Sequence, residues 1–367
     1  MGLKAGIVGL PNVGKSTLFN AITKQNILAA NYPFATIDPN VGIVTVPDSR
    51  LSFLEEMYVP KRCVPTSFEF TDIAGLVAGA SKGEGLGNKF LSHIREVDAV
   101  VEVVRCFDNS DVIHVSGTVD PVRDIEVINV ELVLSDLEIV ENRLGKIAKK
   151  AQTTKEKDAL LEYDVLSKCK EALLNNEPIR SITSFDEDEL LYLKNFNFIT
   201  AKPIIFVANV SEDDAVVGHN KYTEEVSKYA LEHNSSVIVM CAKLESELVE
   251  YEESDKRSFM ESLGITSTGL DQLIFATYHL LGLQTFFTVG KDECKAWTFK
   301  AGMTAKKCAG LIHSDIERGF IKAEVMKFSD LEEMGDEKKV QEAGKLYLEG
   351  KDYIMQDGDI VYFRFNV

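Results

Sequence analysis

The residues of this chain that are best suited to chemistry lie near its amino terminus, in the run Gly9-Leu10-Pro11-Asn12-Val13-Gly14-Lys15-Ser16. The run matches G-x-x-x-x-G-K-[ST], in which glycines let the backbone turn tightly and aim N–H groups at phosphate oxygens. Lys15 adds a positive charge near the β- and γ-phosphates, and the Ser16 hydroxyl can ligate Mg²⁺. A β-type run precedes the loop and a helical pattern follows it, as this mechanism requires. The predicted nucleotide-binding residues here are Asn12, Val13, Gly14, Lys15, Ser16 and Thr17.

Further residues predict a metal site and loops that respond to a γ-phosphate. Asp72 ends the β-type run Phe68–Thr71, and a carboxylate at a strand end can hold Mg²⁺ through water. Gly75 can offer its backbone N–H to the γ-phosphate, and Thr36 lies in a loop from which its hydroxyl can reach the same metal. The glycine-rich residues 79–87 are typical of a second switch loop.

Leu76 occupies the place where Ras-like enzymes usually carry a glutamine that orients the attacking water. Leucine cannot hydrogen-bond a water, so hydrolysis must be helped from elsewhere or be slow. Two interpretations therefore stay open: a hydrolysing switch, and a nucleotide-gated binding protein with negligible turnover.

The base-binding segments favour ATP over GTP. GTP-specific relatives carry N-K-x-D, whose aspartate pairs with two guanine donors, whereas this chain has Asn209-Val210-Ser211-Glu212 after the apolar run Pro203–Ala208. The lysine is absent and the acid is one methylene longer, so the pocket loses its means of holding guanine. Cys241-Ala242-Lys243 follows the next apolar run, where such proteins place a backbone N–H against the base. A GTPase remains a further alternative.

The surrounding elements alternate between strand and helix, which predicts an α/β fold with a mostly parallel sheet covered on both faces. Apolar residues at steps of three and four between Val130 and Ala151, followed by the weaker series Leu160, Tyr163, Leu166, Cys169 and Leu173, predict a projecting helical hairpin; two surface helices are the alternative. In the tail we expect strands at 286–289, 296–299, 352–355 and 360–365, a helix at 304–316 and a turn at Asp357-Gly358, in a small α+β domain.

Composition narrows the class of protein. The chain has 367 residues, 45% of them hydrophobic, and a net charge of −18, which argues against general attraction to nucleic acid. Its six cysteines form no Cys-x-x-Cys pair, and no apolar stretch approaches a membrane span. We therefore expect a cytoplasmic protein with no membrane or DNA partner. A local basic cluster stands out at the predicted hairpin tip and suggests contact with RNA phosphates, although a solvated helix end explains it equally well: Arg143, Lys146, Lys149, Lys150, Lys155 and Lys157.

These features together resemble the Obg-like ATPases, YchF subfamily, over the whole chain. The resemblance is carried by the motifs at 9–16, 31–36, 72–76 and 209–212 and by His114-Val115 with Gly117 and Val119-Asp120-Pro121. It implies a Ras-like P-loop nucleotide domain (1–129 and 196–282), an inserted coiled-coil hairpin (130–195) and a carboxy-terminal TGS domain of β-grasp form (283–367).

The resemblance also implies ATP as substrate, Mg²⁺ at Ser16 and Thr36, and association with ribosomes, so that the basic tip would meet ribosomal RNA. It implies that His114 assists hydrolysis in place of the missing glutamine, although by itself His114 is an ordinary loop histidine. Asn12 is similar to the asparagine of relatives that bind K⁺ beside the phosphates. Cys241 departs from the serine of many relatives, which leaves a backbone contact intact.

Overall fold

The computed structural model describes residues 3–28, 40–73, 86–109, 112, 114, 117–154 and 156–366, and structural statements here concern these residues. They form two compact units, one comprising Met1–Val44 with Glu69–Leu273 and the other Thr45–Phe68 with Ile274–Val367. Each unit is built on a sheet of six strands.

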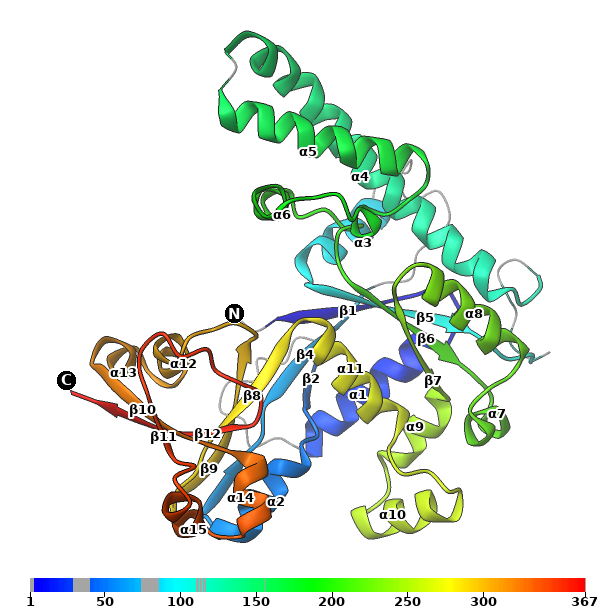
Figure 1. Cartoon of the computed structure of the whole chain (residues 1–367). Helices are drawn as coiled ribbons and strands as arrows, with labels where there is room; N and C mark the ends of the chain where they lie inside the picture. The colour runs from blue at the N-terminus through cyan, green and yellow to red at the C-terminus, as the bar shows by residue number, and fades with distance from the viewer. Residues whose placement is uncertain are drawn as a thin grey trace. The chain divides into compact units, whose positions relative to one another are not determined.

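The first unit has the strand order β2-β4-β1-β5-β6-β7, and β4, β1, β5, β6 and β7 run parallel to their neighbours. All residues of β5 (Ala99–Arg105) and β6 (Ile204–Asn209) are buried, as expected for central parallel strands covered on both faces. Figure 1 shows α3 (Leu86–Glu96), α4 (Pro121–Thr154) and α8 (Lys221–Glu232) on one side of the sheet. The predicted α/β fold is confirmed.

The other elements of this unit are β1 (Lys4–Val8), α1 (Lys15–Leu28), β2 (Val41–Thr45), β4 (Ser67–Asp72), α5 (Lys157–Leu174), η1 (Ile179–Ser181), α6 (Glu187–Leu193), η2 (Lys194–Phe196), α7 (Glu212–Val217), β7 (Ser236–Met240), α9 (Ala242–Leu248), α10 (Glu253–Ser262) and the start of α11 (Gly269–Leu280). Because β1, β4, β5, β6 and β7 are parallel, the loops that follow them gather at one edge of the sheet. That edge carries the predicted site.

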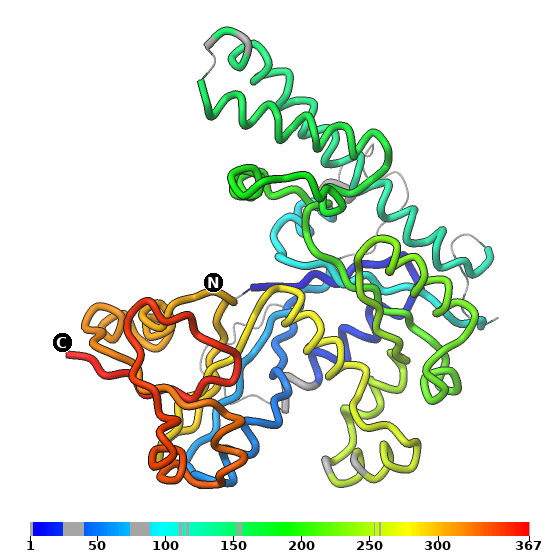
Figure 2. Tube along the Cα trace, in the orientation of Figure 1, coloured from blue at the N-terminus to red at the C-terminus, as the bar shows by residue number. Residues whose placement is uncertain are grey.

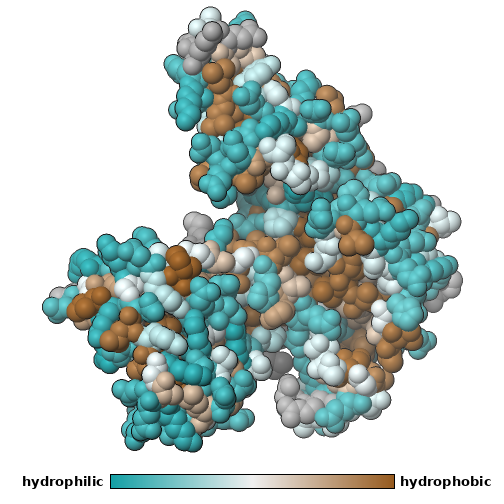
Figure 3. Space-filling model, viewed as in Figure 1, coloured by the Kyte–Doolittle hydropathy of each residue, from teal (hydrophilic) through white to brown (hydrophobic). Residues whose placement is uncertain are grey.

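The helical hairpin of α4 and α5 extends away from the sheet of its unit, as Figures 1 and 2 show, so the projecting arrangement is confirmed over the flat one. Its seam contains the predicted Val133, Leu137, Val140, Leu144 and Ile147. They pack against Val165, Leu166, Cys169 and Leu173. Figure 3 shows hydrophilic residues interspersed with hydrophobic ones on the visible face of the hairpin.

Three details of the hairpin differ from the prediction. Val130 and Leu160 are 38% and 41% exposed, and Leu161, next to Leu160, is the residue that packs into the seam. The first helix also begins earlier, at Pro121, because Ile125 and Ile128 are buried in the nucleotide-binding half of the unit. A single long helix therefore serves both the sheet and the hairpin.

The second unit has the strand order β11-β10-β12-β8-β9-β3. Two hydrophobic clusters form its core, one around Phe287, Met326 and Ile360 and the other around Phe286 and Val361. Phe286 and Phe287 are consecutive residues of β8, so the two clusters lie on opposite faces of the sheet. Its elements are α2 (Ser49–Tyr58), β3 (Arg62–Val64), β8 (Leu283–Thr288), β9 (Glu293–Lys300), α12 (Ala305–Ile312), α13 (Ser314–Arg318), β10 (Phe320–Lys327), α14 (Phe328–Met334), α15 (Glu337–Glu342), β11 (Tyr347–Glu349) and β12 (Asp359–Phe365).

Several predicted elements of this unit are wrong in detail. The helix expected at 304–316 is two helices, since His313 has extended backbone (φ −163°, ψ 143°) that ends α12 and caps α13. Residues 352–355 form no strand, only a bridge between Ile354 and Thr304. The turn at Asp357-Gly358 is present, with Gly358 at φ 83°.

Residues 45–68 belong to this second unit, although the predicted boundaries grouped them with the nucleotide domain. The reason is packing: Leu51 and Leu54 of α2 join the cluster around Phe287, and β3 pairs in parallel with β9. The remaining domain boundaries stay predictions. Within the described residues, no helix is both long and apolar enough to span a bilayer.

Candidate nucleotide-binding site

The loop between β1 and α1 has the backbone that a phosphate-binding turn needs. Asn12 and Gly14 have positive φ, 65° and 96°, and the Leu18 N–H donates to the Gly14 carbonyl (3.0 Å) to start the helix. A β-carbon on Gly14 would lie 2.1 Å from Nδ2 of Asn209, so both the conformation and the space require glycine here. The loop lines a cavity of about 450 Å³ together with Lys15, Ser16 and Thr17.

The predicted phosphate lysine lines this cavity and pairs with the predicted metal carboxylate. Lys15 forms an ion pair with Asp72, and Lys15 is 9% exposed. The two residues are brought together because β1 and β4 are adjacent parallel strands with Ile7 opposite Asp72. Ser16, on the same loop, is exposed and lines the cavity. A cation and two oxygen donors therefore gather where a triphosphate and its metal would be held.

Asn209 ties the phosphate loop to the base-binding segments. Its Nδ2 donates to the Val13 carbonyl (2.8 Å), and its Oδ1 accepts from the Ala242 N–H (2.9 Å). The residue is 4% exposed, so both hydrogen bonds are shielded from water. Asn209 thus cross-links two loops. The Ala242 N–H, in the segment where the sequence predicts a backbone N–H that faces the base, donates to Asn209 instead.

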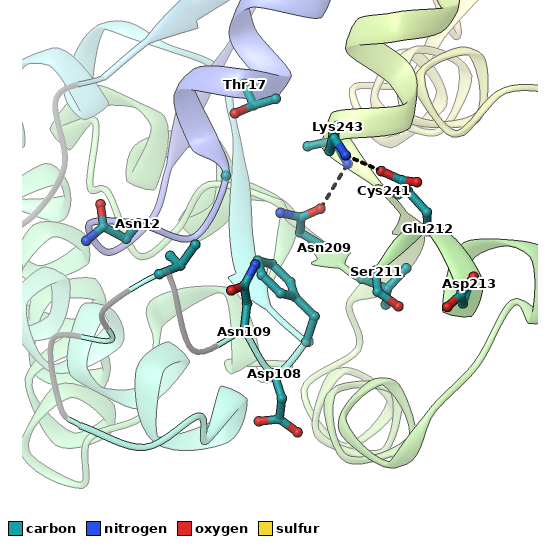
Figure 4. Close-up of a pocket in the computed structure, with 15 residues that line it drawn as sticks. Asn12, Thr17, Asp108, Asn109, Asn209, Ser211, Glu212, Asp213, Cys241 and Lys243 are labelled. Atoms are coloured by element: carbon teal, nitrogen blue, oxygen red, sulfur yellow. Dashed lines mark hydrogen bonds and ion pairs between the residues drawn. The ribbon is translucent and has the colours of Figure 1, made fainter.

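These loops enclose a pocket of about 550 Å³. Figure 4 shows Asn12 of the phosphate loop, the Asp108–Asn109 loop and the Ser211–Asp213 segment around one space. Nine of the predicted nucleotide-binding residues line it: Asn12, Gly14, Thr17, Asn209, Val210, Glu212, Cys241, Ala242 and Lys243. Val13 is buried and contributes its carbonyl to the Asn209 cross-link, and Lys15 and Ser16 line the phosphate cavity instead.

The acid that replaces the guanine-binding aspartate has a cationic partner. Glu212 Oε1 lies 2.6 Å from Lys243 Nζ, the contact that a dashed line marks in Figure 4, and Lys243 also approaches Glu247 at 3.9 Å. The hydrogen bond to Glu212 and its charge raise the pKa of Lys243. Glu212 begins α7, whose cap is the Ser211 side chain accepting from the Asp214 N–H.

Cys241 supplies the cap of α9 from within the pocket. Its sulfur accepts from the Leu244 N–H at 3.5 Å, and burial raises the pKa of the thiol. The residue therefore replaces a capping hydroxyl rather than offering a reactive thiolate.

His114 does not line the base pocket. It is 9% exposed, and its Nε2 lies 2.8 Å from Oδ2 of the buried Asp124 in the first turn of α4. A separate cavity of about 540 Å³ contains His114 with Arg105 and Tyr222. This cavity and the base pocket share three residues, Asp108, Asn109 and Val112, so the two cavities adjoin at these residues.

The structure also identifies residues that the sequence analysis missed. Phe107, Asp108, Asn109 and Val112 line the base pocket from the loop after β5. These four residues could have been predicted from the order of the parallel strands, because the loop after a central strand lies at the edge of the sheet where ligands bind. The predicted Thr36 and Gly75, like Leu76, fall outside the described residues.

The parallel sheet, the G-x-x-x-x-G-K-S loop and the Lys15–Asp72 pair together define a P-loop nucleoside-triphosphatase of the Ras-like type. A family model described as a 50S ribosome-binding GTPase matches residues 4–143, and one named YchF-GTPase_C, described as a protein of unknown function, matches residues 283–366. The chain belongs to the YchF subfamily of the Obg-like ATPases.

Relatives match along the whole chain. The Ribosome-binding ATPase YchF of Bacillus subtilis (strain 168) is 58% identical, with all of both chains covered. Obg-like ATPase 1 of Caenorhabditis elegans is 44% identical over 99% of this chain and 92% of its own. The solved structure of the Schizosaccharomyces pombe YchF GTPase has a TM-score of 0.90 at 40% identity, covering 99% of this chain and 98% of that one.

Proposed function

We propose that this protein is an ATP-binding and ATP-hydrolysing switch that associates with the ribosome and regulates translation or a stress response. The observation that carries the choice of nucleotide is the pairing of Glu212 with Lys243 at 2.6 Å. Relatives named ribosome-binding ATPases support both the activity and the partner. A ribosomal partner also supports a cytoplasmic location.

The preference for ATP follows from the hydrogen-bonding groups that the pocket offers to the base. Guanine presents two donors, N1–H and the 2-amino group, and needs a carboxylate that can accept both. Here the acid at the place of the guanine-binding aspartate, Glu212, is engaged by a lysine, and the Asn209 side chain is fixed in the loop cross-link by one hydrogen bond from Nδ2 and one to Oδ1. Adenine lacks the 2-amino group and has an acceptor at N1, so it does not need that acid.

Competition between ATP and GTP for one fluorescent nucleotide tests this preference. We expect ATP to displace the probe at lower concentration than GTP. Tight GTP binding with feeble ATP binding would overturn the proposal and return the chain to the GTPases, the name that the Schizosaccharomyces pombe structure carries.

Mg²⁺ fits the donor set at the phosphate cavity, because hard oxygen ligands are what it prefers. Ser16 offers an exposed hydroxyl and Asp72 a carboxylate beside Lys15, and we propose that Thr36 adds a second hydroxyl. The metal would neutralise charge on the phosphates. Asn12, which lines both cavities, is the proposed contact for K⁺; exchanging potassium for sodium in the assay tests that role.

His114 is the proposed aid to hydrolysis. A histidine held by a carboxylate has the arrangement of a base with its orienting partner, and Asp124 supplies that carboxylate at 2.8 Å. Replacing His114 with alanine should lower kcat and leave ATP affinity unchanged. An unchanged kcat would exclude the role.

The burial of His114 in a cavity other than the base pocket also favours a second candidate, a nucleotide-gated binding protein with negligible turnover. Steady-state phosphate release separates the two functions when it is measured with and without ribosomes and with and without potassium. Stimulated release supports the switch, and release no faster than that of a Lys15→Ala variant supports the binding protein.

The hairpin tip is the proposed contact with ribosomal RNA, of the large subunit or of the whole ribosome. Part of its basic cluster is engaged within the chain: Arg143 pairs with Glu162 (3.3 Å), and Lys150 with Glu156 (2.8 Å). Lys146, Lys149 and Lys157 are at least partly exposed on the same hairpin, while Lys155 lies outside the described residues.

Charge reversal at the tip tests this contact. The double variant Lys149→Glu and Lys150→Glu should sediment less with ribosomes and show a shallower dependence on salt. The matched control is Lys338→Glu with Lys339→Glu, which reverses two consecutive lysines on α15 and changes the net charge equally. Equal sedimentation of the two double variants would remove the tip from the proposal.

A further inference from the structure

The loop that follows β5 is held from behind by one buried arginine. Arg105, the last residue of β5, is 2% exposed. Its guanidinium donates to three backbone carbonyls of the loop: Nε to Phe107 (3.1 Å), Nη1 to Val112 (2.9 Å) and Nη2 to Asn109 (3.1 Å). The same guanidinium lies 4.7 Å from the centre of the Phe107 ring.

This arrangement depends on the shape of the arginine side chain as well as on its charge. A guanidinium is planar and carries five donors in a rigid fork, so it can bind carbonyls in three directions at once. The lysine ammonium concentrates its donors on one atom and lacks a plane to stack on a ring. A lysine at this position would keep the positive charge and lose the geometry.

The three carbonyls that Arg105 holds belong to residues that line the base pocket. Two other contacts fix the start of the same loop: the Cys106 N–H donates to the Asn209 carbonyl (2.8 Å), and the Cys106 carbonyl accepts from Asn220 Nδ2 (2.8 Å). The loop is thus anchored to the strand that carries the base-binding motif. Its Asp108, Asn109 and Val112 also border the cavity of His114.

We propose that Arg105 is a positioning residue for nucleotide recognition: by holding the carbonyls of Phe107, Asn109 and Val112, it fixes the side of the pocket that the base of the nucleotide contacts. This inference rests on the proposed function, because it assumes that the pocket binds an adenine nucleotide. Arg105 acts through the loop and lies outside the phosphate cavity of Lys15 and Ser16. Its loss should therefore weaken recognition of the base and leave recognition of the phosphates intact.

The variant Arg105→Lys tests this role. A fluorescent ATP analogue should bind about tenfold more weakly. In the variant the residues after β5 are less ordered before binding, so part of the binding free energy is lost in ordering them. Inorganic tripolyphosphate, which has no base, should bind within about twofold of its wild-type affinity. KM for ATP should rise about tenfold while kcat at saturating ATP changes by less than about twofold.

Arg95→Lys is the matched control for losing an arginine fork. Arg95 donates to Ser135 Oγ (2.8 Å), to Asp136 Oδ1 (3.1 Å) and to the Asn197 carbonyl (3.4 Å), and it lines neither cavity. It should lower thermal stability without changing ATP affinity. If Arg105→Lys binds the analogue as tightly as Arg95→Lys does, Arg105 has no role in recognition and the inference fails.

A milder variant keeps the test decisive if Arg105→Lys does not fold. The Tyr222 hydroxyl donates to the Asp108 carboxylate (2.8 and 3.0 Å). Tyr222→Phe removes these two hydrogen bonds and keeps the aromatic ring, so it leaves no cavity in the protein. ATP affinity should fall about twofold to threefold with tripolyphosphate unaffected. An unchanged affinity here would count against the inference.

The wild-type measurements separate the two levels of the argument. If wild-type protein prefers GTP, the proposed function fails whatever the variants do. If it prefers ATP and the variants match it, only the Arg105 inference fails.

Discussion

The Asn209→Asp variant probes the cross-link on which the site depends. The substitution keeps the size of the side chain and exchanges one amide for a carboxylate. Oδ1 can still accept from the Ala242 N–H, but the atom that donates to the Val13 carbonyl at 2.8 Å becomes an acceptor. Two oxygens then face each other in a place where the residue is only 4% exposed.

The cost can be worked from these contacts. Losing the hydrogen bond removes about 1 kcal/mol, and leaving the buried Val13 carbonyl without a donor adds about 1–3 kcal/mol. We therefore expect the free energy of unfolding to fall by about 2–4 kcal/mol at neutral pH. Because the Val13 carbonyl belongs to the phosphate loop, nucleotide affinity should fall as well.

The deficit should depend on pH in a defined direction. The carboxyl group that the Asn209→Asp substitution introduces is buried and faces a carbonyl. Its folded-state pKa therefore rises above the unfolded value of about 3.9, because only the protonated acid can donate to Val13. Below the unfolded pKa the acid is protonated in both states and the deficit is smallest. It grows as the pH rises and is complete above the folded-state pKa.

Urea unfolding followed by circular dichroism measures the deficit, and hydrogen exchange should place the lost protection at residues 9–18 and 241–244. Asn142→Asp is the control, because Asn142 is exposed within α4 and the substitution adds the same charge. A deficit below about 1 kcal/mol at neutral pH, or equal deficits in the two variants, would refute the reasoning.

Three further predictions follow from particular contacts. Lys243→Gln frees the Glu212 carboxylate, so competition binding should show GTP gaining about threefold relative to ATP. Burial raises the pKa of Glu102 to about 8 and that of Glu245 to about 7, so wild-type stability in urea should fall as pH rises from about 4.5 to about 8, and Glu102→Gln should make that fall shallower, most clearly above about pH 7. Asp136, fully buried, accepts from Arg95, Ile199 and Thr200, so Asp136→Asn should lower the free energy of unfolding by about 2–4 kcal/mol in the same assay.

The features that the sequence predicted well are those whose geometry is encoded locally. The phosphate loop carries its own turn, and Gly14 at φ 96° is the residue type that this turn requires. The heptad from Val133 to Ile147 specifies a seam because helical period alone puts these residues on one face. The predicted runs Phe68–Thr71 and Pro203–Ala208 agree with β4 and β6 within one residue at each end.

The features that were missed depend on contacts between distant residues. The apolar residues of α2 predict that one face is buried but do not specify which sheet covers it. They pack against the sheet that contains Phe287, a residue more than 200 positions further along the chain. Leu160 and Leu161 are consecutive and equally apolar, so helical periodicity does not decide which of them is buried. The packing of the seam selects Leu161. Arg105 and its loop have no motif, and only the placement of β5 beside β1 and β6 reveals them.

The role of Asn209 shows where specificity must reside in this site. The sequence predicts that Asn209 binds the nucleotide. In the structure its Nδ2 and its Oδ1 each form a hydrogen bond that holds two loops together. The side chains that depart from the guanine-binding motif are more exposed: Glu212 is 49% exposed and its partner Lys243 is 70% exposed. Exposed substitutions disturb stability little, whereas the buried supports, Asn209 and Arg105, are costly to change. A family built on such a site can change its nucleotide through these exposed side chains while its phosphate loop and buried supports stay the same.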